Sequence, residues 1–247
     1  MLLVLCVPAY GTAAEESLLD TEAMDSLKKA VAFLEGLDSF EIHGKAVYDV
    51  VQEDGLRLQF EKSTRLIQQR PDKLYVERLR DNGDVRKFWY DGSNVSILSV
   101  DRNAYAKLRA PDSIDEMLDM FEGLFREPNP LADLLYSDLG HLRDLPDEAF
   151  YVGPSTVGSF VCDHLSFRNA NIDWQLWVQK GETPYIRKVV ITYSNQPGIP
   201  QFVSYLQRWV VPGQINKDTF LFTPPENAER LSIMVPPVVY AEEGGQP

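Results

Sequence analysis

The sequence predicts an α+β fold built on an antiparallel sheet of about ten strands. Three observations support this class: long stretches alternate between apolar and polar residues, Asp-Gly and Asn-Gly turns separate them, and helical periodicity is confined to the start of the chain and one insertion. A parallel sheet needs a crossover helix between successive strands, and the alternating stretches leave no room for one. The 247 residues, 44% of them hydrophobic, suit a single domain with a substantial core.

The chain opens with MLLVLCVPAYGTAAEES, an uncharged apolar run followed by small residues. This pattern is typical of a secretory signal peptide, so we expect residues 1–14 to be removed and the protein to be periplasmic. The positively charged start of such a peptide is missing, which favours an origin further upstream. Cys6 is an alternative lipidation site, although Leu5 stands where a small residue is expected. The run is too short to anchor the chain, so we expect no transmembrane segment in the mature protein.

An amphipathic helix follows the leader. Met24, Leu27, Val31 and Leu34 recur at helical spacing, and Gly36 stands where the helix should end.

From residue 40 the period changes to two, as expected for strands. Phe40, Ile42 and Tyr48 share one face, and Leu58 and Phe60 resume the alternation after a turn at residues 54–55. Alternating runs and turns continue to residue 110, which indicates an antiparallel meander.

A helical insertion interrupts the meander at PDSIDEMLDMFEGLFREPNPLADLLYSDLG. Its apolar stripe runs through Met117, Phe121 and Leu124, and Asp112 or Ser113 is placed to cap its start. We expect a second short helix over residues 131–136.

Further strands are predicted over residues 150–157, 160–168, 174–179, 186–193 and 202–211. Strict alternation would put Trp209 on the same face as Val203 and Tyr205. Both faces of these strands are rich in apolar residues. A plain interpretation is a sheet with a helix packed on one face. A sharper one is a strongly curved sheet whose concave face lines a cavity for an apolar ligand.

The Cys162-Asp163-His164 sequence raises the question of catalysis or metal binding. Cys162 and His164 share one face of a predicted strand, but a zinc site needs three or four ligands, and His43 and His141 have no Cys or His nearby at ligand spacing. A buried thiol beside a hydrogen-bonded imidazole is the simpler interpretation, so we expect no catalytic residue, no metal and no cofactor. A Cys/His-dependent enzyme is the least favoured alternative.

The net charge of −13 argues against nucleic-acid binding and against electrostatic attachment to anionic membranes. So acidic a surface repels nucleic-acid phosphates and anionic headgroups, and we expect no nucleic-acid partner.

Three clusters carry a family resemblance: Cys-Asp-His-Leu-x-Phe-Arg at residues 162–168, Asp-Trp-Gln-x-Trp at 173–177 and Phe-x-Phe-x-Pro-Pro at 220–225. With their surroundings they resemble a bacterial family of predicted periplasmic proteins of unknown function, which looks like a branch of the LolA/LolB lipoprotein-carrier superfamily. The resemblance implies a half-open curved antiparallel sheet, an incomplete barrel, wrapped around a helical lid or plug. It also implies a single domain over residues 15–235, followed by a tail at 236–247.

The resemblance further implies an interior that holds a lipid or lipoprotein acyl chain. In the carriers a lid arginine helps to close the cavity, and Arg109 and Arg126 both flank the inserted helix here. The same superfamily includes envelope sensors, so a module that recognises an envelope protein is the main alternative. The residues that we expect to line the cavity, with the last three forming a lid, are Phe40, Ile42, Tyr48, Leu58, Phe60, Phe88, Tyr90, Ile97, Met117, Phe121 and Leu124.

Overall fold

The structure, a computed structural model, describes residues 18–125, 131–144 and 146–232, with the backbone alone for residues 123–125. The predicted leader and the predicted tail at 236–247 lie outside the described residues, as does Arg126.

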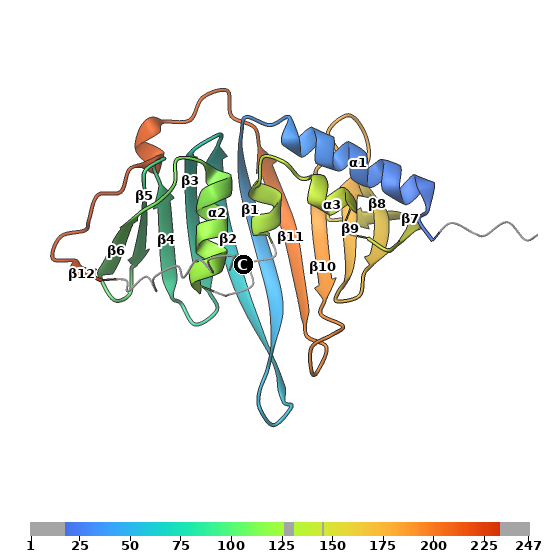
Figure 1. The fold of residues 1–247 in the computed structure, drawn as a ribbon, viewed down its shortest axis with the longest axis horizontal. Coiled ribbons are helices and arrows are strands. Elements are labelled where there is room, and N and C mark those ends of the chain that lie inside the picture. Colours follow the sequence, from blue (N-terminus) through green and yellow to red (C-terminus); the bar gives the residue numbers. More distant parts are fainter. Residues whose placement is uncertain (1–17, 126–130, 145, 233–247) are drawn as a thin grey trace, which may run out of the picture.

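The described strands form one twelve-stranded sheet in the order β12-β6-β5-β4-β3-β2-β1-β11-β10-β9-β8-β7 (Figure 1). Two meanders, β1 to β6 and β7 to β11, are joined by antiparallel pairing of β1 with β11. The strands are β1 Ser39–Val51, β2 Arg57–Gln69, β3 Lys73–Arg80, β4 Val85–Tyr90, β5 Asn94–Ser99, β6 Ala104–Arg109, β7 Glu148–Val157, β8 Phe160–Arg168, β9 Asp173–Gln179, β10 Ile186–Thr192, β11 Gln201–Val210 and β12 Glu229–Leu231.

The sheet is open, with β12 and β7 at its two edges, so the predicted half-open curved sheet is confirmed. It has more strands than the sequence predicts. One reason is β12, a three-residue strand that pairs parallel to β6 and is too short to show a period of two.

The helices lie over one face of the sheet, which we call the inner face (Figure 1). They are α1 Thr21–Glu35, α2 Ile114–Phe125, the 3₁₀ turn η1 Ala132–Leu135 and α3 Gly140–Asp144. Helix α1 covers β7, β8 and β9, and α2 lies across the β1–β6 half. A second 3₁₀ turn, η2 Lys217–Phe220, contacts β3 on the opposite, outer face.

The local sequence explains the two main helices. The Asp20 carboxylate accepts hydrogen bonds from the backbone N–H groups of Glu22 and Ala23 and thereby caps α1, which ends at Gly36 as predicted. Ser113 rather than Asp112 caps α2, because its Oγ accepts from the N–H of Glu116 at 3.2 Å. The predicted second helix is a single 3₁₀ turn, and α3 was not predicted.

The main core lies between these helices and the inner face. It joins the buried side of α1 to side chains from both meanders, among them Leu27, Val31, Leu34, Phe40, Leu66, Leu74, Tyr90, Met117, Leu165, Phe167, Leu176 and Leu206.

The prediction that Trp209 lies on the same face as Val203 and Tyr205 is wrong. The pairing of β1 with β11 shifts register between His43 and Gly44, so β11 contains an extra residue at Gln207. This bulge turns Trp209 to the inner face, where its ring lies 5.6 Å from that of Phe40.

The outer face of the β1–β6 half is covered by the C-terminal segment. Phe220 is buried against Ile67 and Tyr75, and the ring of Phe222 lies 5.0 Å from Trp89 and 5.2 Å from Tyr105. The Phe-x-Phe-x-Pro-Pro cluster therefore serves packing. None of the described helices is both long and apolar enough to cross a membrane.

Candidate functional site

Most of the predicted cavity residues lie on the inner face of the sheet or on helix α2, which covers it. Phe40, Ile42, Tyr90 and Met117 are fully packed into the main core, with exposed fractions of 7% or less. Phe88, Ile97 and Phe121 are only partly buried against it. Phe88, Ile97 and Phe121 therefore retain exposed surface that a ligand can contact. The four buried residues mainly shape the interior.

The rest of the predicted set lies toward the long β1–β2 hairpin. Tyr48 and Phe60 stack with ring centroids 6.0 Å apart, and Leu58 is 38% exposed. The side chain of Leu124 lies outside the described residues. Which of these residues contacts a ligand stays a prediction.

Arg109, one of the two candidates for a lid arginine, does not face the interior. It alternates with the inner-face residue Leu108 on β6 and is exposed on the outer face.

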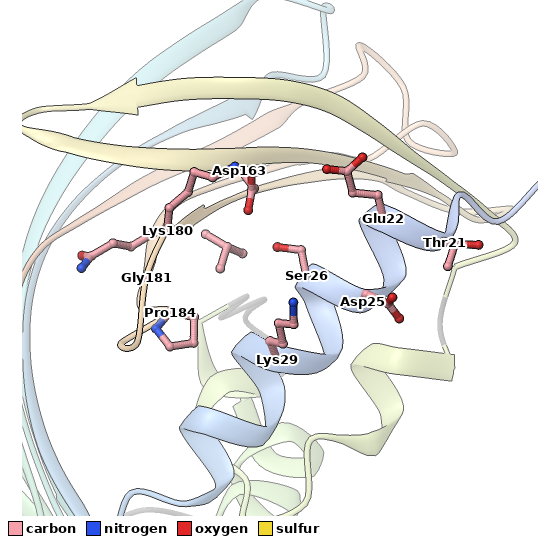
Figure 2. Close-up of a pocket in the computed structure, with 11 residues that line it drawn as sticks. Thr21, Glu22, Asp25, Ser26, Lys29, Asp163, Lys180, Gly181 and Pro184 are labelled. Atoms are coloured by element: carbon pink, nitrogen blue, oxygen red, sulfur yellow. Dashed lines mark hydrogen bonds and ion pairs between the residues drawn. The ribbon is translucent and has the colours of Figure 1, made fainter.

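A polar pocket of about 610 Å³ lies between α1 and the β8–β9 strands, at the other end of the inner face (Figure 2). Figure 2 shows Ser26 and Lys29 of α1 facing Asp163 and Lys180. The lining mixes both charges and is completed by Thr21, Glu22, Asp25, Val178, Gln179, Gly181 and Pro184. No sequence pattern predicts this pocket, because a helix and a hairpin that are far apart in the chain combine to form it.

Asp163 is held in the pocket by two side-chain hydrogen bonds. Its Oδ1 accepts hydrogen bonds from Lys180 Nζ and from the Tyr151 hydroxyl, each at 2.6 Å. Burial raises the pKa of this carboxyl, but the hydrogen bonds from Lys180 and Tyr151 outweigh it, and the net pKa is lowered. The carboxylate is therefore ionised and satisfied, which is a structural rather than a proton-transferring state.

Cys162 and His164 lie on the outer face, away from this pocket. Cys162 is fully buried, and burial raises the pKa of its thiol, so little of the nucleophilic thiolate forms. The His164 ring stacks on Trp177 with centroids 4.1 Å apart, and its Nε2 lies 2.9 Å from Gln175 Oε1. The arrangement matches the buried thiol and hydrogen-bonded imidazole that the sequence favours.

The other histidines lie apart from this pair: His43 contacts Glu41, and His141 packs edge-on against Tyr136. Among the described residues, no three His, Cys, Asp or Glu side chains are grouped so that they could hold a metal ion.

A buried arginine that the sequence did not single out lies beside Cys162. The Arg187 guanidinium stacks on the Phe160 ring at 3.6 Å, and its Nε donates to Gln179 Oε1 at 2.8 Å. The pairing of β9 with β10 shifts register at Arg187, which explains how a charged residue enters a run of apolar ones.

Comparison with known proteins adds a family and a fold. Residues 23–234 match the sequence profile of a family described as predicted periplasmic protein (DUF2092). No curated protein matches the sequence significantly. Among solved structures, LprF from Mycobacterium bovis is similar with a TM-score of 0.51 at 12% identity, over 85% of this chain and 99% of LprF.

Two further structures resemble the chain more weakly. An uncharacterized conserved protein from Thermus thermophilus gives a TM-score of 0.47 at 11% identity, over 85% of this chain and 99% of its own. The Mycobacterium tuberculosis lipoprotein LppX gives 0.43 at 9% identity, over 80% and 100%. At such identities the likeness to LprF shows a shared fold.

Proposed function

The chain belongs to the DUF2092 family of predicted periplasmic proteins, and from that premise we propose that it binds a lipid or a lipoprotein acyl chain on its inner face, without catalysing a reaction. The periplasm separates two membranes by water, so a hydrocarbon chain crosses it only when a protein shields it. Burial of each methylene contributes about 0.8 kcal/mol, so one or two acyl chains provide ample binding energy.

The observation that supports this proposal is the apolar character of the inner face beyond the packed core. Partly exposed rings and aliphatic side chains continue from α2 and the middle of the sheet to the β1–β2 hairpin. They come from β1, β2, β4, β5 and α2, and comprise Tyr48, Leu58, Phe60, Phe88, Ile97 and Phe121. An apolar surface of this kind on an otherwise acidic protein favours a binding site over a solvated face.

The proposal is tested by native mass spectrometry of protein purified from its own envelope without detergent, together with titration of a fluorescent fatty acid. We expect a lipid-sized adduct and saturable uptake. Phe60→Ser should weaken uptake about tenfold, since it removes apolar contact area. The matched control is Leu79→Ser, because Leu79 is 46% exposed on the outer face of the next strand. Bare protein in every preparation and no uptake would contradict the proposal.

A second function is favoured by the β7 edge of the sheet. Phe150 and Val152 of this strand are 46% and 55% exposed. Residues 18–20 already pair with the β7 backbone at Ala149, and the rest of such an edge strand can pair with a strand of another protein. An envelope protein is the partner expected on this alternative. A stoichiometric protein captured from envelope extract, independent of lipid and lost in Phe150→Asp, would favour the partner-binding function over the carrier function.

A further inference from the structure

Four basic residues converge on the inner face of β2, β3 and β4. Lys62 lies opposite Arg80 in the β2–β3 ladder, and Arg78 lies opposite Arg86 in the β3–β4 ladder. All four alternate in register with core residues such as Leu66, Val76 and Phe88, so they share the inner face. We call Lys62, Arg78, Arg80 and Arg86 the basic patch.

The basic patch stands out against the composition of the chain. Acidic residues outnumber Lys and Arg by 37 to 24, yet none of the inner-face positions in the described strands β1–β6 is acidic. On the outer face of the same strands, several basic residues are matched with acids. Lys87 pairs with Glu77 at 3.0 Å, and Arg65 pairs with Glu41 at 2.8 Å.

Two of the four carboxylates of the neighbouring helix α2 are engaged elsewhere. Asp115 accepts from the Ser137 backbone N–H at 2.9 Å, and Asp119 accepts from the Tyr136 hydroxyl at 2.9 Å. Within the part of the chain that the structure describes, neither the Arg80 nor the Arg86 guanidinium has an ion-pair partner.

Like charges placed directly opposite each other in a sheet destabilise it. The basic patch contains two pairs of like charges at facing positions. A bound anion would remove that repulsion and accept charge-assisted hydrogen bonds from the guanidinium groups, which suit carboxylate and phosphate geometry.

The basic patch borders the apolar inner face. The Lys62 ammonium lies 5.1 Å from the centroid of the Tyr48 ring and 5.4 Å from that of Phe202. Phe60 precedes Lys62 by two positions on β2, and Phe88 follows Arg86 by two positions on β4, so each apolar side chain lies next to a basic one on the same face.

We propose that the ligand of the inner face is an anionic amphiphile, whose carboxylate or phosphate headgroup binds Arg80, Arg86 and the rest of the basic patch while its hydrocarbon tail lies on the adjoining apolar side chains. This inference rests on the proposed function and adds the charge and orientation of the ligand. It also accounts for how a protein with a net charge of −13 retains an anion that most of its surface repels.

The experiment compares a fluorescent long-chain fatty acid with its methyl ester, which has the same tail and no charge, at about pH 8, where the carboxylate is ionised. The native chain should bind the acid about tenfold more tightly than the ester, and salt should weaken only the acid. The double variant Arg80→Gln/Arg86→Gln should lose this preference and bind the ester as before.

The matched control is Lys107→Gln/Arg109→Gln, which removes the same charge from exposed outer-face positions of β6. It should keep the preference for the acid, and circular dichroism should show that both double variants are folded.

The other outcomes separate the two proposals. Equal affinity for acid and ester, or an unchanged preference in Arg80→Gln/Arg86→Gln, overturns the headgroup site and leaves acyl-chain binding intact. Binding of neither compound overturns both proposals. If inorganic phosphate alone binds the native chain as tightly as the fatty acid does, the basic patch is a site for a free anion and the amphiphile is the wrong ligand.

Discussion

Phe121 of α2 meets Phe88 of β4 edge to face, with ring centroids 5.2 Å apart and ring planes at 74°. This geometry is favourable for aromatic pairs because the positive ring edge faces the negative ring centre. The contact fixes α2 across the inner face, and it joins one predicted lid residue to one predicted wall residue. The position of the lid over the sheet therefore depends on side chains that are themselves proposed to contact the ligand.

Phe121→Ala is expected to lower the free energy of unfolding by about 2 kcal/mol, since it removes an aromatic pair and a half-buried ring. Uptake of the fluorescent fatty acid should weaken as well. Chemical denaturation and the same titration measure the two effects. Glu122→Ala is the control, because Glu122 is the exposed next residue of α2, and it should change neither quantity. An unchanged affinity in Phe121→Ala would show that α2 is not part of the site.

Arg70, which follows β2, links the sheet to the end of α1 and to the residue after η1 through hydrogen bonds. Its Nη1 lies within 3.0 Å of the carbonyl oxygens of Leu34, Glu35 and Leu37 at the end of α1, and its Nη2 donates to that of Tyr136 at 2.8 Å. The carbonyls of Leu34 and Glu35 lie in the last turn of α1, where the helix provides no donor four residues further on.

Arg70→Met is expected to cost about 3 kcal/mol of stability, because several buried acceptors lose a charged donor at once. Arg70→Lys should recover little of the loss, since a single ammonium cannot reach two groups of carbonyls as a guanidinium does. Thermal unfolding compares both variants with Arg102→Met, an exposed arginine in a turn. Full recovery by lysine would mean that charge alone, and not the fork geometry, holds α1 in place.

The sequence predicts the parts of the fold that depend on local periodicity. The stripe through Leu27, Val31 and Leu34 and the stop at Gly36 define α1, and the alternation from Phe40 defines β1. Likewise, the Cys162-Asp163-His164 stretch is a strand with Cys162 and His164 on one face, as its alternation indicates.

Features that depend on pairing between distant segments escape sequence patterns. The bulge at Gln207 places Trp209 on the opposite face from the one predicted, and no residue type next to Gln207 indicates a bulge. Sequence patterns do not predict the basic patch either, because Lys62, Arg80 and Arg86 become neighbours only through the register of three strands. The pocket around Asp163 needs α1 to lie on β8 and β9, which apolar spacing alone does not specify.

Replacement of Cys162 and His164 tests the enzyme alternative. We expect Cys162→Ala to lower stability by about 1 kcal/mol, since a small buried side chain is lost, and His164→Ala to lower it similarly through the lost stack on Trp177. Both variants should bind the fluorescent fatty acid as the native chain does. A hydrolase or transferase activity found in a substrate screen and abolished by both replacements, at unchanged stability, would instead support catalysis at these residues.

Asp163 makes the packing beside α1 sensitive to acid. The carboxyl's pKa in the folded protein lies below its ordinary value of 3.8: burial raises it, but the hydrogen bonds from Lys180 and Tyr151 outweigh that effect. A group with a lowered folded pKa stabilises the protein above the unfolded pKa, and this contribution is lost as the pH falls through the folded value. The carboxylate therefore contributes fully above about pH 5 and progressively less below about pH 4.

Asp163→Asn should consequently be less stable than the native chain at about pH 7, and the difference should shrink as the pH approaches about 3. Thermal unfolding across this range measures the difference directly. Asp147→Asn is the control, because Asp147 is an exposed carboxylate near the start of β7, and its difference from the native chain should stay close to zero throughout. A difference for Asp163→Asn that is constant with pH would show that packing of the side chain, and not its ionised hydrogen bonds to Lys180 and Tyr151, accounts for its contribution to stability.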